Sequence, residues 1–263
     1  MKTNYRYIEI EITGSVVRIC LNRPERHNAL ILELIEELEM VLTEISARED
    51  LHFIILSGKG RSFCAGADIN WVYSSELLTL EQNTERYLHL SNLLLKLYQL
   101  PQITIATTWG NVFGGGIGLM SVCDFVLAEN NTRFMFSEVK LGLIPATILP
   151  FVAKRISVQN LRKWILTGTM FSTEEAIQSG LIDRICKTGE MESCLTAFLD
   201  SFAQASPAAM KKAKQLINQV SLGEIDGTNP GQTAKLLAEA LLSPDGQEGI
   251  HAFLEKRKPE WEK

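Results

Sequence analysis

The chain has 263 residues, 46% of them hydrophobic and 22% charged, which suits one large globular domain or a core domain with a small appendage. Its 31 acidic residues outnumber its 26 lysines and arginines, so the net charge is -5. A protein that binds nucleic acid through its surface is normally basic, and this balance argues against that class.

In the first half of the chain, predicted strands alternate with predicted helices. Strands are indicated by alternating apolar and charged residues or by short apolar runs, and helices by apolar residues at helical spacing. We expect strands over residues 8–12, 15–21, 53–56 and 103–106, and helices over residues 31–45 and 81–98. Gly14, between the first two strands, predicts a hairpin turn. This order predicts right-handed crossovers on a mostly parallel sheet.

The second half of the chain becomes helical. Ser172 and Glu175 form a capping box for one helix, and Gly180 ends it. We expect short strands at 124–128 and 133–136, and further helices over residues 114–121, 190–205, 207–220 and 228–242. The domain boundary is placed at residue 200, between an α/β core over residues 1–200 and a helical region over residues 201–263.

Five cysteines occur, an odd number without a Cys-x-x-Cys pair, so we expect neither a disulfide framework nor a zinc site. They are Cys20, Cys64, Cys123, Cys186 and Cys194. The start of the chain lacks a secretory signal, and no run approaches the ~20 apolar residues of a membrane helix. These features predict reduced cysteines in a cytoplasmic protein that has no metal and no membrane contact.

Two glycine-containing loops follow buried strands, at residues 62–69 and 110–116. Loops at the carboxyl ends of neighbouring parallel strands face one crevice, and glycine lets the backbone approach a ligand there. If each loop opens a helix, each presents an unpaired backbone N–H, and two such groups form an oxyanion hole. The alternative is that Gly114–Gly116 only allow tight packing of a helix on the sheet.

Other glycine motifs do not fit the sequence. Leu119 stands where a dinucleotide-binding fingerprint needs its third glycine. Neither a P-loop nor the Gly-x-Ser-x-Gly turn of serine hydrolases occurs. Nucleotide-phosphate binding by these motifs and serine hydrolysis are therefore not supported.

Four motifs follow one another along the chain in a fixed order. They are Asn22-Arg-Pro-x-x-x-Asn28-Ala-Leu30, Phe63-Cys-Ala-Gly-Ala-Asp-Ile69, Gly114-Gly-Gly116 before Cys123-Asp124, and Ser137-Glu-Val-Lys-Leu-Gly-Leu-Ile-Pro145. Each motif alone is weak, but the ordered set resembles the crotonase, or enoyl-CoA hydratase/isomerase, family over nearly the whole chain. Segments such as Ala65-Gly-Ala-Asp-Ile-Asn-Trp71 look most like its bacterial methylglutaconyl-CoA hydratases.

The resemblance implies an α/β fold with a crotonase-like core of repeated ββα units, an acyl-CoA thioester substrate, no separate cofactor, and a homotrimer or hexamer. The helical region over residues 201–263 would serve oligomerisation or cover the active site. An oxyanion hole is implied at the backbone amides of Ala67 and Gly115. The residues implied to bind coenzyme A and the acyl group are Arg23, Asn28, Ala29, Leu30, Ala65, Ala67, Asp68, Ile69, Trp71, Phe113, Gly114, Gly115 and Pro145. Two alternatives stay open, because Arg23 could be a solvated turn arginine and Trp71 a packing residue.

Hydratases of this family use two glutamates, and the chain retains one. The first follows the three glycines by two residues, and Gly118 stands at that catalytic position here. The second lies in a Glu-x-x-Leu-Gly segment and matches Glu138. Burial of Glu138 would raise its pKa and prepare it for proton transfer, whereas the alternative is a surface or helix-capping glutamate. The apolar neighbours expected around Glu138 are Phe136, Val139, Leu141 and Leu143.

Two kinds of function fit these residues, and two others are disfavoured. Hydration of a 2-enoyl-CoA, such as methylglutaconyl-CoA, is favoured by the overall resemblance. Isomerisation, in which one carboxylate carries a proton from C2 to C4, is favoured by Gly118. RNA binding through a lysine-rich helix, as in the eukaryotic methylglutaconyl-CoA hydratases, is disfavoured because residues 33–39 are acidic. Binding of CoA without catalysis is disfavoured by the presence of Glu138.

Overall fold

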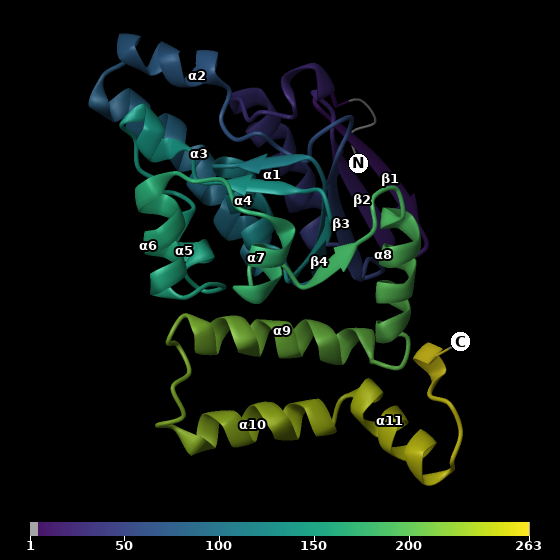
Figure 1. The fold of residues 1–263 in the computed structure, drawn as a ribbon. Helices are drawn as coiled ribbons and strands as arrows, with labels where there is room; N and C mark the ends of the chain where they lie inside the picture. The colour runs from purple at the N-terminus through teal and green to yellow at the C-terminus, as the bar shows by residue number, and fades with distance from the viewer. Residues whose placement is uncertain (1–4, 263) are drawn as a thin grey trace. The chain divides into compact units, whose positions relative to one another are not determined.

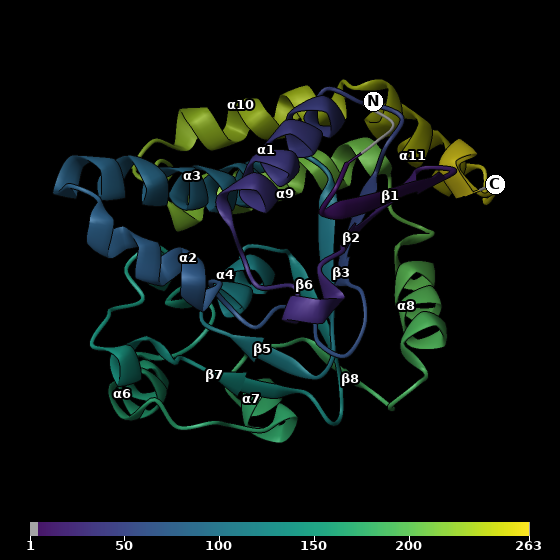
Figure 2. The same cartoon turned by 90° about the horizontal axis from the view of Figure 1, so that it is seen from above.

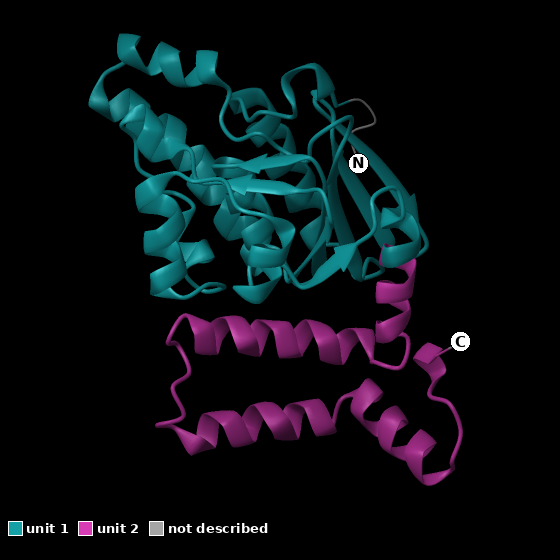
Figure 3. Cartoon of the chain, viewed as in Figure 1, with its two compact units in different colours: residues 1–194 teal, residues 195–263 magenta. Residues whose placement is uncertain are grey.

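The computed structural model describes residues 5–262 and divides the chain into two compact units, Met1–Cys194 and Leu195–Lys263 (Figure 3). The division falls inside helix α8 (Met191–Leu199), close to the predicted boundary at residue 200. Each unit is described below by itself.

Unit 1 is built on a six-stranded sheet with the strand order β1-β2-β3-β4-β6-β8. The predicted hairpin joins β1 to β2 antiparallel, with Gly14 at a φ of 58° in its turn. All other neighbouring strands pair in parallel, which confirms the predicted mostly parallel sheet. The strands are β1 (Ile8–Thr13), β2 (Val16–Leu21), β3 (Phe53–Gly58), β4 (Ile103–Thr108), β6 (Phe125–Glu129) and β8 (Arg184–Cys186).

Two long helices of unit 1, α1 (Leu32–Ser46) and α3 (Leu80–Gln99), pack against each other and lie side by side in both views (Figures 1 and 2). Each buries one apolar face, and on α3 that face includes Leu90 and Leu94. Burying one such side chain contributes about 1.5–3 kcal/mol. A capping box between Thr79 and Gln82 fixes the start of α3.

A separate two-stranded parallel sheet pairs β5 (Asn111–Phe113) with β7 (Arg133–Met135) (Figure 2). Helix α4 (Gly115–Ser121) begins two residues after β5. The sequence predicts a loop where β5 lies, and its patterns indicate neither α2 (Ile69–Tyr73) nor β8. Elements of three to five residues carry too little periodicity to be recognised, and tertiary pairing specifies them instead.

The rest of unit 1 connects these sheets through short helices. They are α5 (Leu149–Val152), α6 (Val158–Thr167) and α7 (Thr173–Gln178), with 3-10 turns at Pro24–Arg26, Ser74–Leu77 and Glu138–Leu141. The predicted capping box of α7 is present, with Ser172 and Glu175 bonded reciprocally.

Unit 2 consists of helices that leave much apolar surface exposed. After the end of α8 come α9 (Pro207–Ser221), α10 (Pro230–Leu241) and α11 (Pro244–Leu254), with 3-10 turns at Asp200–Phe202 and Glu260–Glu262. Helix α11 was not predicted, although Ser243 and Pro244 supply its capping signals. Leu237 and Leu242 are each more than 70% exposed. Contiguous exposed apolar surface often marks an interaction site, and the predicted oligomer stays a prediction.

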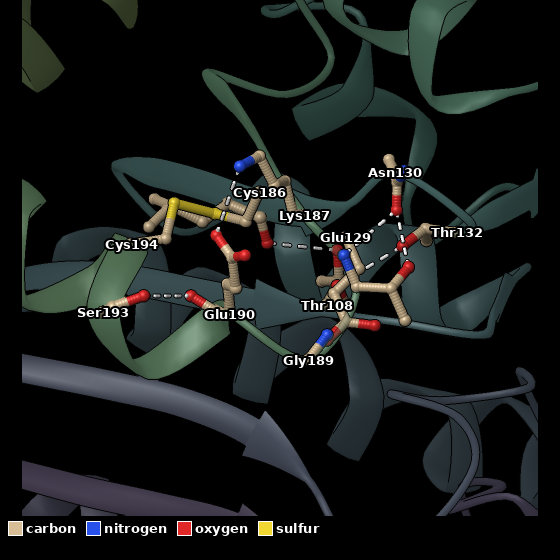
Figure 4. Close-up of a disulfide and its surroundings, with 12 residues drawn as sticks. Thr108, Glu129, Asn130, Thr132, Cys186, Lys187, Gly189, Glu190, Ser193 and Cys194 are labelled. Carbon is tan, nitrogen blue, oxygen red and sulfur yellow. Dashed lines mark hydrogen bonds and ion pairs between the residues drawn. A yellow bond between two sulfur atoms is a disulfide. The ribbon is translucent and has the colours of Figure 1, made fainter.

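A disulfide joins Cys186, at the end of β8, to Cys194 in α8 (Figure 4). The expectation of reduced cysteines was therefore wrong for this pair, whereas Cys20, Cys64 and Cys123 are free. The two Cα atoms lie 5.9 Å apart because the intervening turn folds α8 back towards β8. The N–H of Gly189 in this turn donates to Glu129 at 2.9 Å. A cysteine count gives no information about such a local pairing.

Replacing Cys194 by serine is expected to lower the free energy of unfolding by about 2–3 kcal/mol, because the disulfide closes a short loop and restricts the unfolded chain. Urea unfolding of the parent and the variant, with and without a dithiol reductant, measures this loss. Reductant should bring the parent to the stability of the variant and leave the variant unchanged. Equal sensitivity of both proteins to reductant would contradict the assignment.

Candidate active site

Parallel backbone pairing holds four chain segments side by side at the candidate site. Phe113 of β5 pairs with Met135 of β7, and single parallel bridges join Cys64 to Val112 and Leu30 to Ala67. The four segments that carry these pairs run in one direction. The residues that follow the pairs therefore lie at the same end of the paired segments. The glycine loop at 114–116 and Glu138 emerge together in this way.

Two backbone amides at this edge have no acceptor. Their neighbours are engaged, since the Gly114 N–H donates to Met135 O at 3.0 Å and the Asp68 N–H to Leu30 O at 2.9 Å. No hydrogen bond within residues 5–262 uses the N–H of Ala67 or of Gly115. A methyl group built on Gly66 would lie 3.7 Å from Gly115 N, so the two amides belong to adjoining turns. Two unpaired amides in adjoining turns are compatible with the predicted oxyanion hole, which stays a prediction.

The three glycines of the loop have different reasons for lacking a side chain. Gly114 has a φ of 44°, which disfavours other residues. A methyl group on Gly116 would lie 2.2 Å from the carbonyl oxygen of Cys64, so this glycine serves close packing. On Gly115 it would meet Leu30 Cδ1 at 2.9 Å, with Ala67 N at 4.0 Å. The packing interpretation therefore holds for Gly116, while Gly115 lies next to the Leu30 side chain and the amide of Ala67.

Glu138 directs its carboxylate at the glycine loop. Its Oε1 would lie 2.9 Å from a methyl group on Gly114, and its Oε2 is buried without a partner among the described residues. Burial raises the pKa of Glu138 above its ordinary value of 4.5, and a hydrogen bond from its own backbone only partly opposes this. The interpretation as a surface glutamate does not fit an unpartnered, desolvated carboxylate.

The expected apolar surroundings of Glu138 are only partly present. Phe136 is buried, but Leu141 and Leu143 are 55% and 43% exposed, so the expectation was wrong for these two leucines. The 3-10 turn Glu138–Leu141 directs consecutive side chains to different sides. Residues distant in sequence, such as Gly114, approach the carboxylate instead.

Gly118 leaves no space for a second carboxylate. A methyl group built there would lie 2.3 Å from Cγ2 and 2.9 Å from Cβ of Ile148, with Leu94 Cδ1 at 3.7 Å. The Cβ of Ile148 is close to its backbone and has little freedom to move. At the position where the two-glutamate hydratases have a carboxylate, Gly118 of this chain packs against the apolar side chain of Ile148.

Arg23 is buried at 9% exposure, so it is not a solvated turn arginine. Its Nη2 lies 3.1 Å from Asp68 Oδ2, its Nη1 donates to the carbonyl of Ala29, and its guanidinium lies over the Tyr7 ring. Burial favours the neutral form of Asp68, but the bonds from Arg23 and from the Asn70 N–H outweigh it and hold the Asp68 pKa below its ordinary value. Arg23 thus ties the first motif to the second.

Asn28 is fully buried and ties the first motif to the chain just before the second. Its Oδ1 accepts from the Arg23 N–H at 2.8 Å, and its Nδ2 donates to the carbonyls of Lys59 and Ser62. Each polar atom of this side chain has a partner within the protein. The structure thus gives Asn28 a role in shaping the site, while direct contact with coenzyme A stays a prediction.

Replacing Arg23 by methionine is expected to lower the free energy of unfolding by about 3 kcal/mol, because Asp68 would keep a buried charge without its partner. Chemical denaturation of the variant measures the loss. The double variant Arg23→Met with Asp68→Asn removes both charges and should recover part of that stability. No recovery in the double variant would contradict the pairing.

The remaining predicted contact residues differ in exposure. Ala29, Leu30 and Pro145 are buried, Ala65 and Phe113 are partly exposed, and Ile69 is 59% exposed. Trp71 is 9% exposed, with Tyr87 edge-on to it at 5.3 Å. Arg86, to which no sequence motif points, lies over the Trp71 ring at 4.4 Å.

Other chemistries find little support at this edge. Burial raises the pKa of Cys64 to about 12, which keeps its thiol protonated and weakly nucleophilic. Within residues 5–262, no group of three or more His, Cys, Asp or Glu side chains is placed to hold a metal ion. Over the same residues, no helix combines the length and apolar composition needed to cross a membrane.

Comparisons with known proteins show the family of this chain. The family described as Enoyl-CoA hydratase/isomerase matches residues 11–263. An enoyl-CoA hydratase of Alternaria alternata is 34% identical, covering 95% of this chain and 82% of its own. The crystal structure of an enoyl-CoA hydratase from Shewanella pealeana matches at 33% identity with a TM-score of 0.91, covering 97% of this chain and 96% of its own. The structure of AtuE from Pseudomonas aeruginosa matches at 31% identity with a TM-score of 0.92. The match covers 98% of this chain and 100% of that one. The chain therefore belongs to the enoyl-CoA hydratase/isomerase family.

Proposed function

We propose that this protein adds water across the double bond of a 2-enoyl-CoA thioester, such as methylglutaconyl-CoA. The observation that carries this proposal is the meeting of two unpaired amides, at Ala67 and Gly115, with the unpartnered carboxylate of Glu138. An acyl thioester offers what these groups lack, an oxygen that gains negative charge and a proton to be moved.

In the proposed reaction, the thioester oxygen accepts hydrogen bonds from both amides. The Glu138 carboxylate takes a proton from water while the water oxygen bonds to C3, and the electrons of the double bond move onto the thioester oxygen. Glu138 then gives the proton to C2 as the enolate collapses. The raised pKa of Glu138 suits a group that both takes and gives a proton.

Isomerisation is the second candidate, and the contact between Gly118 and Ile148 favours it. Moving a double bond needs a single base that removes a proton from one carbon and returns it two carbons away. Hydration is easier when two carboxylates hold the water, and only one is present here. The names of the similar proteins support hydration, which is why it is the first candidate.

The deciding experiment offers purified protein 3-methylglutaconyl-CoA, crotonyl-CoA and a 3-enoyl-CoA, and follows thioester absorbance and product mass. A gain in mass equal to one water supports hydration, whereas a shifted double bond without change in mass supports isomerisation. No turnover of any of the three thioesters would overturn both candidates.

The remaining expectations accompany this proposal. Coenzyme A would enter as part of the substrate, so no separate cofactor is proposed. A homotrimer or hexamer, a cytoplasmic location and a lack of nucleic-acid binding stay predictions. Gel filtration with light scattering tests the first of these directly.

A further inference from the structure

We infer that Trp71 and Arg86 form the far end of the acyl pocket and bind a carboxylate carried by the acyl chain. The inference rests on the proposed function, because it concerns the substrate of the same site. It commits the protein to 2-enoyl-CoA thioesters whose acyl group ends in a carboxylate, and it assigns Arg86 a role in specificity.

The indole N–H of Trp71 is the first observation. The side chain is 9% exposed, and its Nε1 has no hydrogen-bond partner within residues 5–262. Buried tryptophans usually pair this N–H, and a buried donor without an acceptor costs about 1–3 kcal/mol. An acceptor on the ligand would offset that cost, whereas an entirely apolar acyl chain would leave it in place.

The charge of Arg86 is the second observation. Its guanidinium lies 4.4 Å from the centre of the Trp71 ring. It donates only to neutral oxygens, namely Trp71 O at 2.7 Å, Ser74 Oγ at 2.9 Å and Ser75 Oγ at 3.3 Å. Among the residues that the structure describes, it has no acidic partner. A cation over the ring that carries an unpaired N–H gives a carboxylate two groups to which it can bond.

The position of this pair relative to the reacting atoms is the third observation. Helix α2 starts directly after Asp68, so Trp71 lies in its first turn, four residues after Ala67. Helix α3 reaches both Trp71 and the glycine helix α4. Its Tyr87 contacts Trp71, and its Leu94 approaches Gly118. Seven helical residues separate these two contacts, or about 10 Å, which suits a short acyl chain.

Two thioesters that differ only at the far end of the chain test this inference. Glutaconyl-CoA and crotonyl-CoA share the double bond and the thioester, but only the first carries a terminal carboxylate. Trp71→Phe keeps an aromatic ring and removes the N–H, while Arg86→Met removes the charge. The measured quantity is the ratio of kcat/KM for glutaconyl-CoA to kcat/KM for crotonyl-CoA.

The parent protein should prefer glutaconyl-CoA. The ratio should fall about tenfold in Trp71→Phe and about 100-fold in Arg86→Met, the range for hydrogen bonds to charged groups. The loss should appear in KM more than in kcat, and Arg86→Lys should recover part of it. Arg48→Met, which removes an exposed arginine paired with Asp50, is the matched control and should leave the ratio unchanged.

The outcomes separate this inference from the proposed function. If the parent prefers crotonyl-CoA, or if Trp71→Phe and Arg86→Met leave the ratio unchanged, the inference is wrong while the proposed function stands. If the parent turns over neither of these two thioesters nor 3-methylglutaconyl-CoA, the inference and the proposed hydration both fail. Thermal unfolding of each variant identifies any loss that comes from misfolding, and the conservative Trp71→Phe keeps the test decisive if Arg86→Met does not fold.

Discussion

Replacing Glu138 by glutamine is expected to lower kcat by about 10²–10⁴-fold, the usual contribution of a positioned acid/base group. Glutamine keeps the size of the side chain beside Gly114, so binding of the thioester should change little. Steady-state turnover of the best substrate measures the effect. The control is Glu85→Gln on α3, an exposed glutamate that should keep parental activity.

The pH dependence of turnover gives this prediction a second readout. Hydration needs Glu138 ionised, and burial raises its pKa, so the acidic limb of the parental profile should lie above pH 4.5. The limb should vanish in the residual activity of Glu138→Gln. A variant with parental kcat, or with the same acidic limb, would remove Glu138 from the mechanism.

The same carboxylate should also affect stability. Because the folded protein holds Glu138 at a raised pKa, it binds the proton more tightly than the unfolded chain does. This contribution to stability is present at low pH and is lost as pH rises from 4.5 through the raised value. Glu138→Gln lacks this dependence. The free energy of unfolding of the variant, relative to that of the parent, should therefore be higher at neutral pH than in acid.

Replacing Ala67 by proline is expected to lower kcat by about 10²–10³-fold, because proline removes one proposed oxyanion donor. The lost N–H makes no hydrogen bond in the folded protein, so the backbone pairing around it can persist. In particular, the Leu30 N–H still reaches Gly66 O, and the Asp68 N–H still reaches Leu30 O.

Ala67→Gly keeps the N–H and serves as the matched comparison, with an expected loss far smaller than that of proline. Thermal unfolding and binding of a CoA thioester show whether the proline variant still folds and binds. A folded proline variant with parental kcat would mean that the Ala67 amide does not hold the thioester oxygen.

Much of the fold could be predicted from sequence because its larger elements carry regular patterns. The β1–β2 hairpin and helices α1 and α3 follow from apolar periodicity and Gly14. The ordered motifs placed Ala67, Gly115 and Glu138 in one site, and the structure brings the loops around these residues together.

What the sequence could not show depends on contacts between distant segments. Ile148 closes the space at Gly118 from thirty positions further along the chain. Arg86 gains significance only because α3 brings it over Trp71. The disulfide between Cys186 and Cys194 depends on a local turn that a cysteine count does not describe.

The contact between Gly118 and Ile148 has a consequence for how this enzyme could change over evolutionary time. A glutamate introduced at position 118 would collide with the branched carbon of Ile148, so the single substitution would damage the protein before any second carboxylate could act. A smaller residue at 148 would have to appear first, at the cost of a cavity. The order of the two substitutions is therefore constrained, and this lineage cannot gain a two-glutamate site in one step.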